Sequence, residues 1–227
     1  MNRQAVFIIL FAGASLVDLV AASAGWSTGE MFSKPLIVLS LIGYYLSSDA
    51  VRNTTFVRAL FFCWTGDILL IFQSEAPVFF MAGLGAFLIG QILYIISFRR
   101  MQEEGHGNEL SVPQKMRFSF PVVLAGTGLV AILFPKLAGL KFPVLLYAIA
   151  LMLMVMTAIF RYGRTNPKSY WPMLFGAILF MISDATLAMN KFYSPVPTAG
   201  LWIMLTYVAA QYLIVRAAIN HKKSVEL

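Results

Sequence analysis

The chain has 227 residues, of which 59% are hydrophobic and 12% are charged. Soluble domains carry about 25% charged residues, so this composition excludes a water-soluble globular domain and indicates an integral membrane protein. One cysteine excludes an internal disulfide, and two histidines in polar stretches leave no cluster of nitrogen and sulfur ligands for a metal. We expect a single transmembrane domain over residues 1–227.

Charged residues and clusters of Gly, Pro and Asn divide the sequence into eight apolar stretches that could each cross a hydrocarbon core of ~30 Å. The stretches cover residues 4–24, 34–48, 56–72, 78–98, 118–134, 142–160, 171–190 and 198–219. The second is the shortest, and it begins at Lys34 with Pro35 in its first turn. We therefore predict an all-α bundle of eight transmembrane helices.

The first stretch has a second interpretation. Its basic start, its apolar run and the sequence Ala22-Ser23-Ala24 are also typical of a secretory signal with its cleavage site. Asp18 interrupts the apolar run, and cleavage would leave seven helices with the basic clusters on the wrong side of the membrane. We therefore expect a retained first helix.

Lys and Arg residues sort strongly between the two ends of the predicted bundle. Thirteen lie at the end that holds the amino terminus and four at the other end. The thirteen are Arg3, Arg52, Arg58, Arg99, Arg100, Lys115, Arg117, Arg161, Arg164, Lys168, Arg216, Lys222 and Lys223, and the four are Lys34, Lys136, Lys141 and Lys191. Because basic loops stay in the cytoplasm, both termini should be cytoplasmic, and the net charge of +7 needs no nucleic acid partner. Short loops are typical of bacterial membrane proteins, which favours the bacterial inner (plasma) membrane as the location.

Two carboxyl groups interrupt the apolar stretches at Asp67 and Asp184. A charged side chain in mid-span costs about 2.5 to 3.5 kcal/mol, so each needs a reason to be there. At 1.5 Å per residue both lie roughly 16 to 20 Å from the inner ends of their helices, at one level in the outer half of the bilayer. Asp18 has a similar height.

Two carboxyl groups that meet in a low dielectric share a proton, which leaves one acid and one carboxylate. That pair suits general acid and base catalysis, and it is the role we favour for Asp67 and Asp184. The alternative is structural, because each aspartate could hydrogen-bond a neighbouring helix or accept Lys34 as a counter-ion.

The two halves of the chain share a weak sequence similarity. Asp67 is followed sixteen residues later by Gly83-Leu84, and Asp184 is followed sixteen residues later by Gly200-Leu201. This similarity is expected of a parallel four-plus-four repeat, and chance is the alternative explanation.

Six further residues are candidates for substrate binding. Lys34 lies near the headgroup level, where it could snorkel, pair with a lipid phosphate or face an aspartate. The other five are polar residues in mid-span, which could bind substrate or satisfy hydrogen bonds between helices. They are Gln91, Tyr94, Tyr147, Tyr207 and Gln211.

Several short phrases, in this order and spacing, resemble the YhhN family of eight-span membrane proteins. They run from the second stretch to the eighth and cover most of the chain. The phrases are Lys34-Pro35-Leu36, Gly66-Asp67-Ile68-Leu69-Leu70, Gly83-Leu84-Gly85-Ala86-Phe87 with Tyr94, Gly176-Ala177-Ile178-Leu179-Phe180 with Ser183-Asp184, and Thr206-Tyr207 with Ala210-Gln211. The sequence departs from the family at Gln91, where the family commonly has a histidine.

The resemblance implies a lysoplasmalogenase, which hydrolyses the vinyl ether of a lysoplasmalogen to a fatty aldehyde and a glycerophospho-choline or glycerophospho-ethanolamine. The implied partners are this lysophospholipid and the membrane lipids, and no cofactor is implied. Asp67 and Asp184 would be the acid and base, Lys34 would hold the phosphate, and Tyr207 and Gln211 would orient the headgroup or water.

Two other functions fit a pair of buried aspartates. An intramembrane aspartyl protease also uses aspartates from two spans, but a second glycine two residues before Gly66 and the further loop motifs of that class are missing. A proton-coupled transporter would use buried aspartates as relays between two halves of the bundle.

Overall fold

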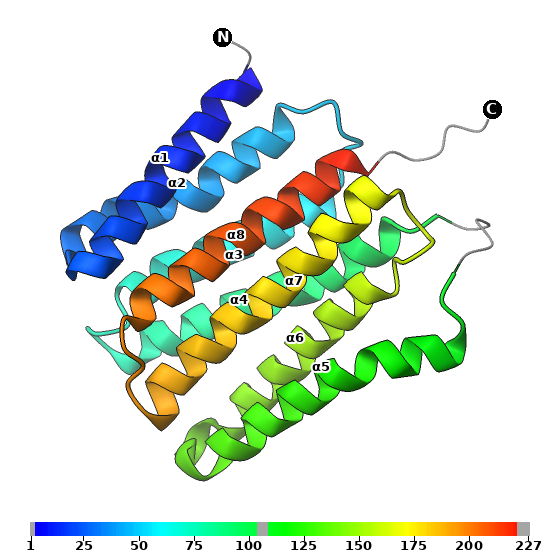
Figure 1. Cartoon of the computed structure of the whole chain (residues 1–227). Coiled ribbons are helices and arrows are strands. Elements are labelled where there is room, and N and C mark those ends of the chain that lie inside the picture. Colours follow the sequence, from blue (N-terminus) through cyan, green and yellow to red (C-terminus); the bar gives the residue numbers. More distant parts are fainter. Residues whose placement is uncertain (1–2, 104–108, 222–227) are drawn as a thin grey trace.

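The computed structural model describes residues 3–103 and 109–221, and in that part of the chain it contains eight long helices (Figure 1). They are α1 (Arg3–Ala24), α2 (Ser27–Leu46), α3 (Thr54–Ile71), α4 (Pro77–Arg100), α5 (Val112–Leu133), α6 (Lys141–Ile159), α7 (Pro167–Ala188) and α8 (Ala199–Asn220). Two short 3₁₀ turns, η1 (Phe134–Lys136) and η2 (Ala138–Leu140), link α5 to α6, and a π-helical turn, η3 (Met189–Tyr193), follows α7. The all-helical prediction is confirmed.

The helices run up and down, so the described chain begins and ends at the same end of the bundle (Figure 1). The helices α3, α4, α7 and α8 form the centre, with α1 and α2 on one side and α5 and α6 on the other. The tightest pairs are α7 with α8, α3 with α4, and α1 with α2. Large apolar side chains are exposed along the outer faces, as expected for a surface that contacts lipid tails.

Side-chain caps fix where several helices begin. The Asn53 side chain accepts a hydrogen bond from the Phe56 N–H at 3.1 Å, and that of Asn166 accepts one from the Ser169 N–H at 2.9 Å. Ser111 and Gln114 form a capping box at the start of α5. These caps satisfy amide groups that a helix start would otherwise leave unpaired.

The second helix differs from the prediction. It begins at Ser27 rather than Lys34, so Pro35 lies inside the helix and not in its first turn. The reason is local: Gly25, at φ +65°, ends α1, and the chain re-enters a helix at once through a polar first turn that an apolar pattern does not detect. Pro35 has no N–H to donate within the helix. Its carbonyl accepts a hydrogen bond from Trp64 Nε1 at 2.9 Å, which ties α2 to α3.

Seven of the described helices are long and apolar enough to cross a membrane, and α2 is the exception because of its polar first turn. It nevertheless packs between α1 and α3 within the same bundle. The chain is therefore a multi-pass integral membrane protein.

Small residues bring the central helices close together. A Cβ on Gly90 would lie 3.0 Å from the Cys63 sulfur, and one on Gly176 would lie 3.0 Å from the Ala210 carbonyl oxygen. At Gly66 it would meet the Phe87 ring at 2.6 Å.

The basic end of the bundle is held by Arg161, whose guanidinium is fully buried just after α6. It donates hydrogen bonds to the Met101 carbonyl and to both the carbonyl and hydroxyl oxygens of Ser169. Burial lowers the pKa of Arg161 to about 10, so the side chain keeps its charge at neutral pH. His106, Lys222 and Lys223 lie outside the described residues.

Candidate active site

Asp67 and Asp184 lie on one cavity of about 310 Å³ in the centre of the bundle. Helices α2, α3, α4, α7 and α8 and the turn η3 contribute its walls. The complete lining is Glu30, Lys34, Asp67, Leu70, Gln73, Phe87, Ser183, Asp184, Leu187, Asn190, Lys191, Gly200, Ile203, Met204 and Tyr207. The depth argument from the sequence thus agrees with the geometry, because both carboxyl groups face one space.

A chain of buried hydrogen bonds supports Asp67. The Tyr207 hydroxyl donates to Asp67 Oδ2 at 2.8 Å and accepts from Gln211 Nε2 at 3.1 Å. Gln211 Oε1 in turn accepts from the Tyr94 hydroxyl at 2.7 Å. All three supporting side chains are buried, so each hydroxyl and amide group holds the next in a fixed orientation.

Two donors from other helices meet at Asp184. The Tyr147 hydroxyl from α6 donates to Asp184 Oδ2 at 2.5 Å, and Gln91 Nε2 from α4 donates to the same oxygen at 3.3 Å. Both bonds fall on Oδ2. Gln91 Oε1 is buried without a hydrogen-bond partner in the described part of the chain.

The two aspartates are held by side chains from different helices. Asp67 on α3 is bound from α8, whereas Asp184 on α7 is bound from α4 and α6. The Phe87 ring lines the cavity between these groups and packs edge-on against Tyr207.

Lys34 faces the same cavity but forms an ion pair with Glu30, one turn earlier on α2. Sequence reasoning missed Glu30, although its spacing of four residues from Lys34 is the signal for such a pair. It also missed Lys191 and Asn190, which η3 brings to the cavity wall. Single π-helical turns of this kind are frequent at functional sites.

Asp18 is fully buried but does not line the cavity. It accepts a hydrogen bond from the Ser33 hydroxyl at 2.7 Å, which joins α1 to α2. The geometry therefore gives Asp18 a structural contact rather than a place at the site. The described residues include no group of three or more His, Cys, Asp or Glu side chains that could hold a metal ion.

Comparison with known proteins identifies the family. Residues 29–218 match the YhhN family. The chain belongs to the YhhN family. The matched region contains every residue that faces the cavity, so the site of this YhhN protein lies wholly within the shared part of the sequence.

Several curated relatives of this YhhN protein are named lysoplasmalogenases. Lysoplasmalogenase TMEM86A of Bos taurus is 28% identical over 92% of this chain and 85% of the relative. Lysoplasmalogenase TMEM86B of Sus scrofa is 32% identical over 80% of the chain and 71% of the relative. A lysoplasmalogenase of Mycobacterium bovis is 29% identical over 70% and 58% respectively. No solved structure matches the chain.

Proposed function

We propose that this YhhN protein hydrolyses the vinyl ether bond of lysoplasmalogens, releasing a fatty aldehyde and a glycerophospho-headgroup. The observation that carries the proposal is the pair of aspartates on one cavity within the matched region. The names of the relatives support the same reaction. This reaction makes the protein an ether hydrolase whose substrate is a lysophospholipid.

The chemistry needs a proton donor, water and a group that stabilises positive charge. A carboxylic acid protonates the β-carbon of the vinyl ether, which gives an oxocarbenium ion. Water adds to the carbon attached to oxygen while the second carboxylate takes its proton. The hemiacetal then collapses: the second acid protonates the departing glycerol oxygen, and the first carboxylate removes the hydroxyl proton. Both carboxyl groups return to their starting states.

The residues around the cavity suit these roles. Tyr207 and Tyr147 fix the orientation of Asp67 and Asp184, so neither carboxyl group has to reorganise during the reaction. Gln211 and Tyr94 support the Tyr207 contact from behind, and Gln91 donates directly to Asp184. We assign them positioning roles rather than the direct substrate contacts that the sequence predicted.

Two lysines supply positive charge at the mouth of the cavity. Lys34 and Lys191 line both this cavity and a wider, polar vestibule of about 580 Å³ next to it. A phosphate between them would be bound by charge-assisted hydrogen bonds. Glu30 and Glu75, which also line the vestibule, provide negative charge for a choline or ethanolamine group.

The vestibule lies at the end of the bundle opposite the two termini, because its residues come from the α1–α2 and α3–α4 connections and from η3. If the basic end is cytoplasmic, as the charge distribution indicates, the site opens to the outer face of the plasma membrane. A cysteine introduced at exposed Glu75 in a Cys63→Ala background should then react with an impermeant maleimide in intact cells. Labelling only in permeabilised cells would show that the site opens to the cytoplasm instead.

The test of the function is mass-spectrometric detection of fatty aldehyde after purified protein is incubated with a lysoplasmalogen. The matched control is the alkyl-ether lysolipid with the same headgroup and chain length, which lacks the double bond and should survive. A transmembrane peptide in a parallel incubation distinguishes a protease. Release of no aldehyde by folded protein would refute the proposal.

A further inference from the structure

A second, apolar cavity adjoins the site on the side of α5 and α6. It is lined by Leu70, Phe80, Leu84, Phe87, Leu129, Val130, Leu133, Val144, Tyr147, Ala148, Leu151, Asp184, Ala185, Leu187, Ala188 and Phe192. We call it the apolar slot. Its volume is about 70 Å³, against about 310 Å³ for the cavity that both aspartates line, so it is the smaller of the two.

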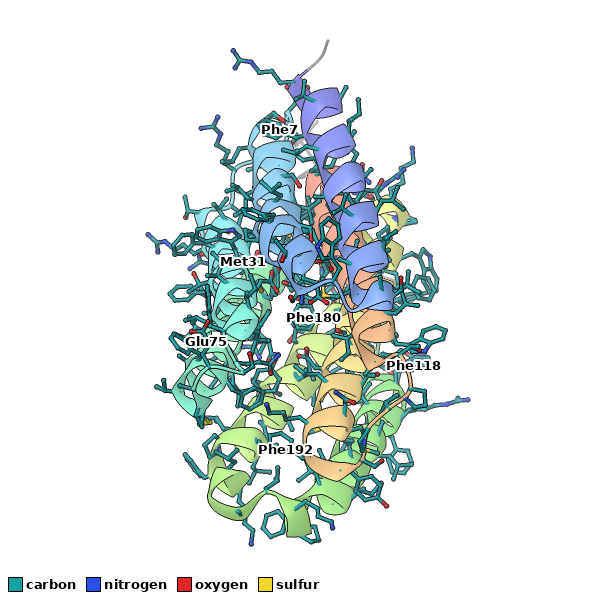
Figure 2. The ribbon with its side chains drawn as sticks, turned by 90° about the vertical axis from the view of Figure 1, so that its left-hand side faces the viewer. Phe7, Met31, Glu75, Phe118, Phe180 and Phe192 are labelled. Atoms are coloured by element: carbon teal, nitrogen blue, oxygen red, sulfur yellow. The ribbon has the colours of Figure 1, made fainter. Side chains whose placement is uncertain are left out.

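The slot and the site share a wall. Leu70, Phe87, Asp184 and Leu187 line both cavities, whereas Asp67 lines only the polar one. Asp184 is therefore at the junction, with its carboxyl group between a polar space and an apolar one. The slot also contains Phe80 and Phe192, whose ring centres lie 5.8 Å apart in an edge-on contact. Phe192 lies near one end of the bundle (Figure 2).

The order of these cavities matches the order of groups in a single-chain ether lipid. The vestibule with Lys34, Glu30 and Lys191 is polar, the two aspartates follow, and the slot is almost entirely apolar. A lysoplasmalogen has a charged headgroup, then the vinyl ether oxygen and double bond, then a long hydrocarbon chain. A phosphate in the slot would be buried without a cationic partner there, which excludes the reverse orientation.

We propose that the apolar slot takes the first part of the substrate's alkenyl chain and so holds the double bond beside Asp184. This inference rests on the proposed function. The slot is too small to enclose a long chain, so the remaining carbons extend from it into the bilayer. Lipid tails are as apolar as leucine side chains, so moving the alkenyl chain from the bilayer into the slot adds little to the binding affinity. The slot therefore acts by positioning the double bond.

A bulky side chain in the slot should therefore impair long-chain substrates selectively. Ala148→Phe on α6 and Val130→Phe on α5 fill the slot from different walls. Ala131→Phe is the matched control, because Ala131 is the next residue of α5 and is exposed on the outer face. Each variant is assayed with a hexadecenyl and a butenyl glycerophosphocholine.

Misplacement by about 1 Å can cost roughly 10²-fold in rate, so we expect kcat/KM for the hexadecenyl lipid to fall at least tenfold in both slot variants. For the butenyl lipid, whose chain ends within the slot's entrance, we expect a change of less than about threefold on the same principle. The Ala131→Phe control should match the unmodified protein on both. Equal losses on both lipids, or no loss on either, would overturn the proposal.

A measurement without turnover separates this inference from the proposed function. A non-cleavable alkyl-ether lysophosphatidylcholine with a diazirine near the glycerol end of its chain is photo-cross-linked to the unmodified protein. Labels should fall on slot residues of α5, α6 and α7, and excess unlabelled lipid should remove them. Labels confined to the exposed outer faces would refute the slot even if the protein releases aldehyde. Slot labelling without aldehyde release would support the binding mode and refute the reaction.

Discussion

Asp67 and Asp184 face the same cavity, yet the protein surrounds them differently. Asp67 accepts one hydroxyl, which a chain of two further side chains supports from within the core. Asp184 accepts two donors on one oxygen and lies where the polar cavity meets the apolar slot. The difference indicates that the neighbouring side chains can give two carboxyl groups on one cavity separate tasks.

The proposed substrate orientation assigns a different catalytic role to each aspartate. The β-carbon of the vinyl ether is the second carbon of the chain, so it lies on the slot side, next to Asp184. Asp67 lies on the side of the ether oxygen and the headgroup. We therefore expect Asp184 to donate the proton to carbon and Asp67 to receive the proton of the attacking water.

The largest effect should come from removing either carboxyl group. Asp184→Asn and Asp67→Asn keep the size of the side chain but not its proton chemistry, and general acid and base catalysis contributes about 10²- to 10⁴-fold. We expect aldehyde release to fall by about 10³-fold in both variants on that scale. The measurement is initial rates on detergent-purified protein whose thermal unfolding matches that of the unmodified chain. Retained activity in either variant would remove that residue from catalysis.

Deuterium incorporation into the substrate distinguishes the roles of the two aspartates in the same two variants. In D₂O, Asp67→Asn should still protonate the β-carbon but add water poorly, so the cation reverts and unreacted substrate gains deuterium. Asp184→Asn should leave unreacted substrate at its original mass. Mass spectrometry of recovered lysoplasmalogen measures this. The opposite pattern would exchange the two roles, and incorporation in neither variant would reject the assignment.

The next effect distinguishes the tyrosines that hold the aspartates. Tyr207→Phe removes a donor to Asp67 and also leaves Gln211 Nε2 without its acceptor, and an unpaired buried group costs about 1 to 3 kcal/mol. Tyr147→Phe removes a donor from Asp184, which retains Gln91. We therefore expect Tyr207→Phe to lower the melting temperature and Tyr147→Phe to lower kcat with little change in stability. Equal melting temperatures would contradict the difference.

Much of this arrangement could be predicted from the sequence, because carboxyl and tyrosine side chains are rare inside apolar helices and stand out there. Helix lengths gave the depth of Asp67 and Asp184, which agrees with their shared cavity. Depth does not give the direction in which a side chain points around its helix. The sequence therefore did not identify the hydrogen-bond partners, which are Tyr207 for Asp67 and Tyr147 and Gln91 for Asp184.

The outer wall of the site could not be predicted, because local backbone geometry decides it. The first turn of α2 is polar, so an apolar pattern began that helix at Lys34 and omitted Glu30. Lys191 and Asn190 depend on a π-helical turn that no spacing rule identifies. Asn190 Oδ1 also accepts from the Val196 N–H at 3.0 Å, which fixes the following loop.

A smaller effect should separate the two lysines. Lys34 is paired with Glu30, whereas the Lys191 amine lies 4.9 Å from the centre of the Phe80 ring. Replacing either by Met should raise KM more than it lowers kcat if both bind phosphate. The effect of Lys191→Met should be larger, because Glu30 already neutralises part of the charge of Lys34. Steady-state kinetics on a lysoplasmalogen measure this, and Lys168→Met at the opposite end of the bundle is the control. A larger rise in KM for Lys34→Met would reverse the ranking.

The smallest effect should come from the far end of the chain that supports Asp67. Tyr94 contacts Gln211 but does not line the cavity, so Tyr94→Phe removes one hydroxyl and leaves Gln211 Oε1 unpaired. That loss should cost about 1 kcal/mol of stability, since a neutral hydrogen bond contributes about that much. Gln211 would still donate to Tyr207, so we expect kcat to fall less than about threefold, a fraction of what a catalytic donor contributes. If Tyr94→Phe instead lowers kcat well beyond about threefold, the whole chain acts as one unit on Asp67, and the support of that aspartate extends three side chains from the cavity.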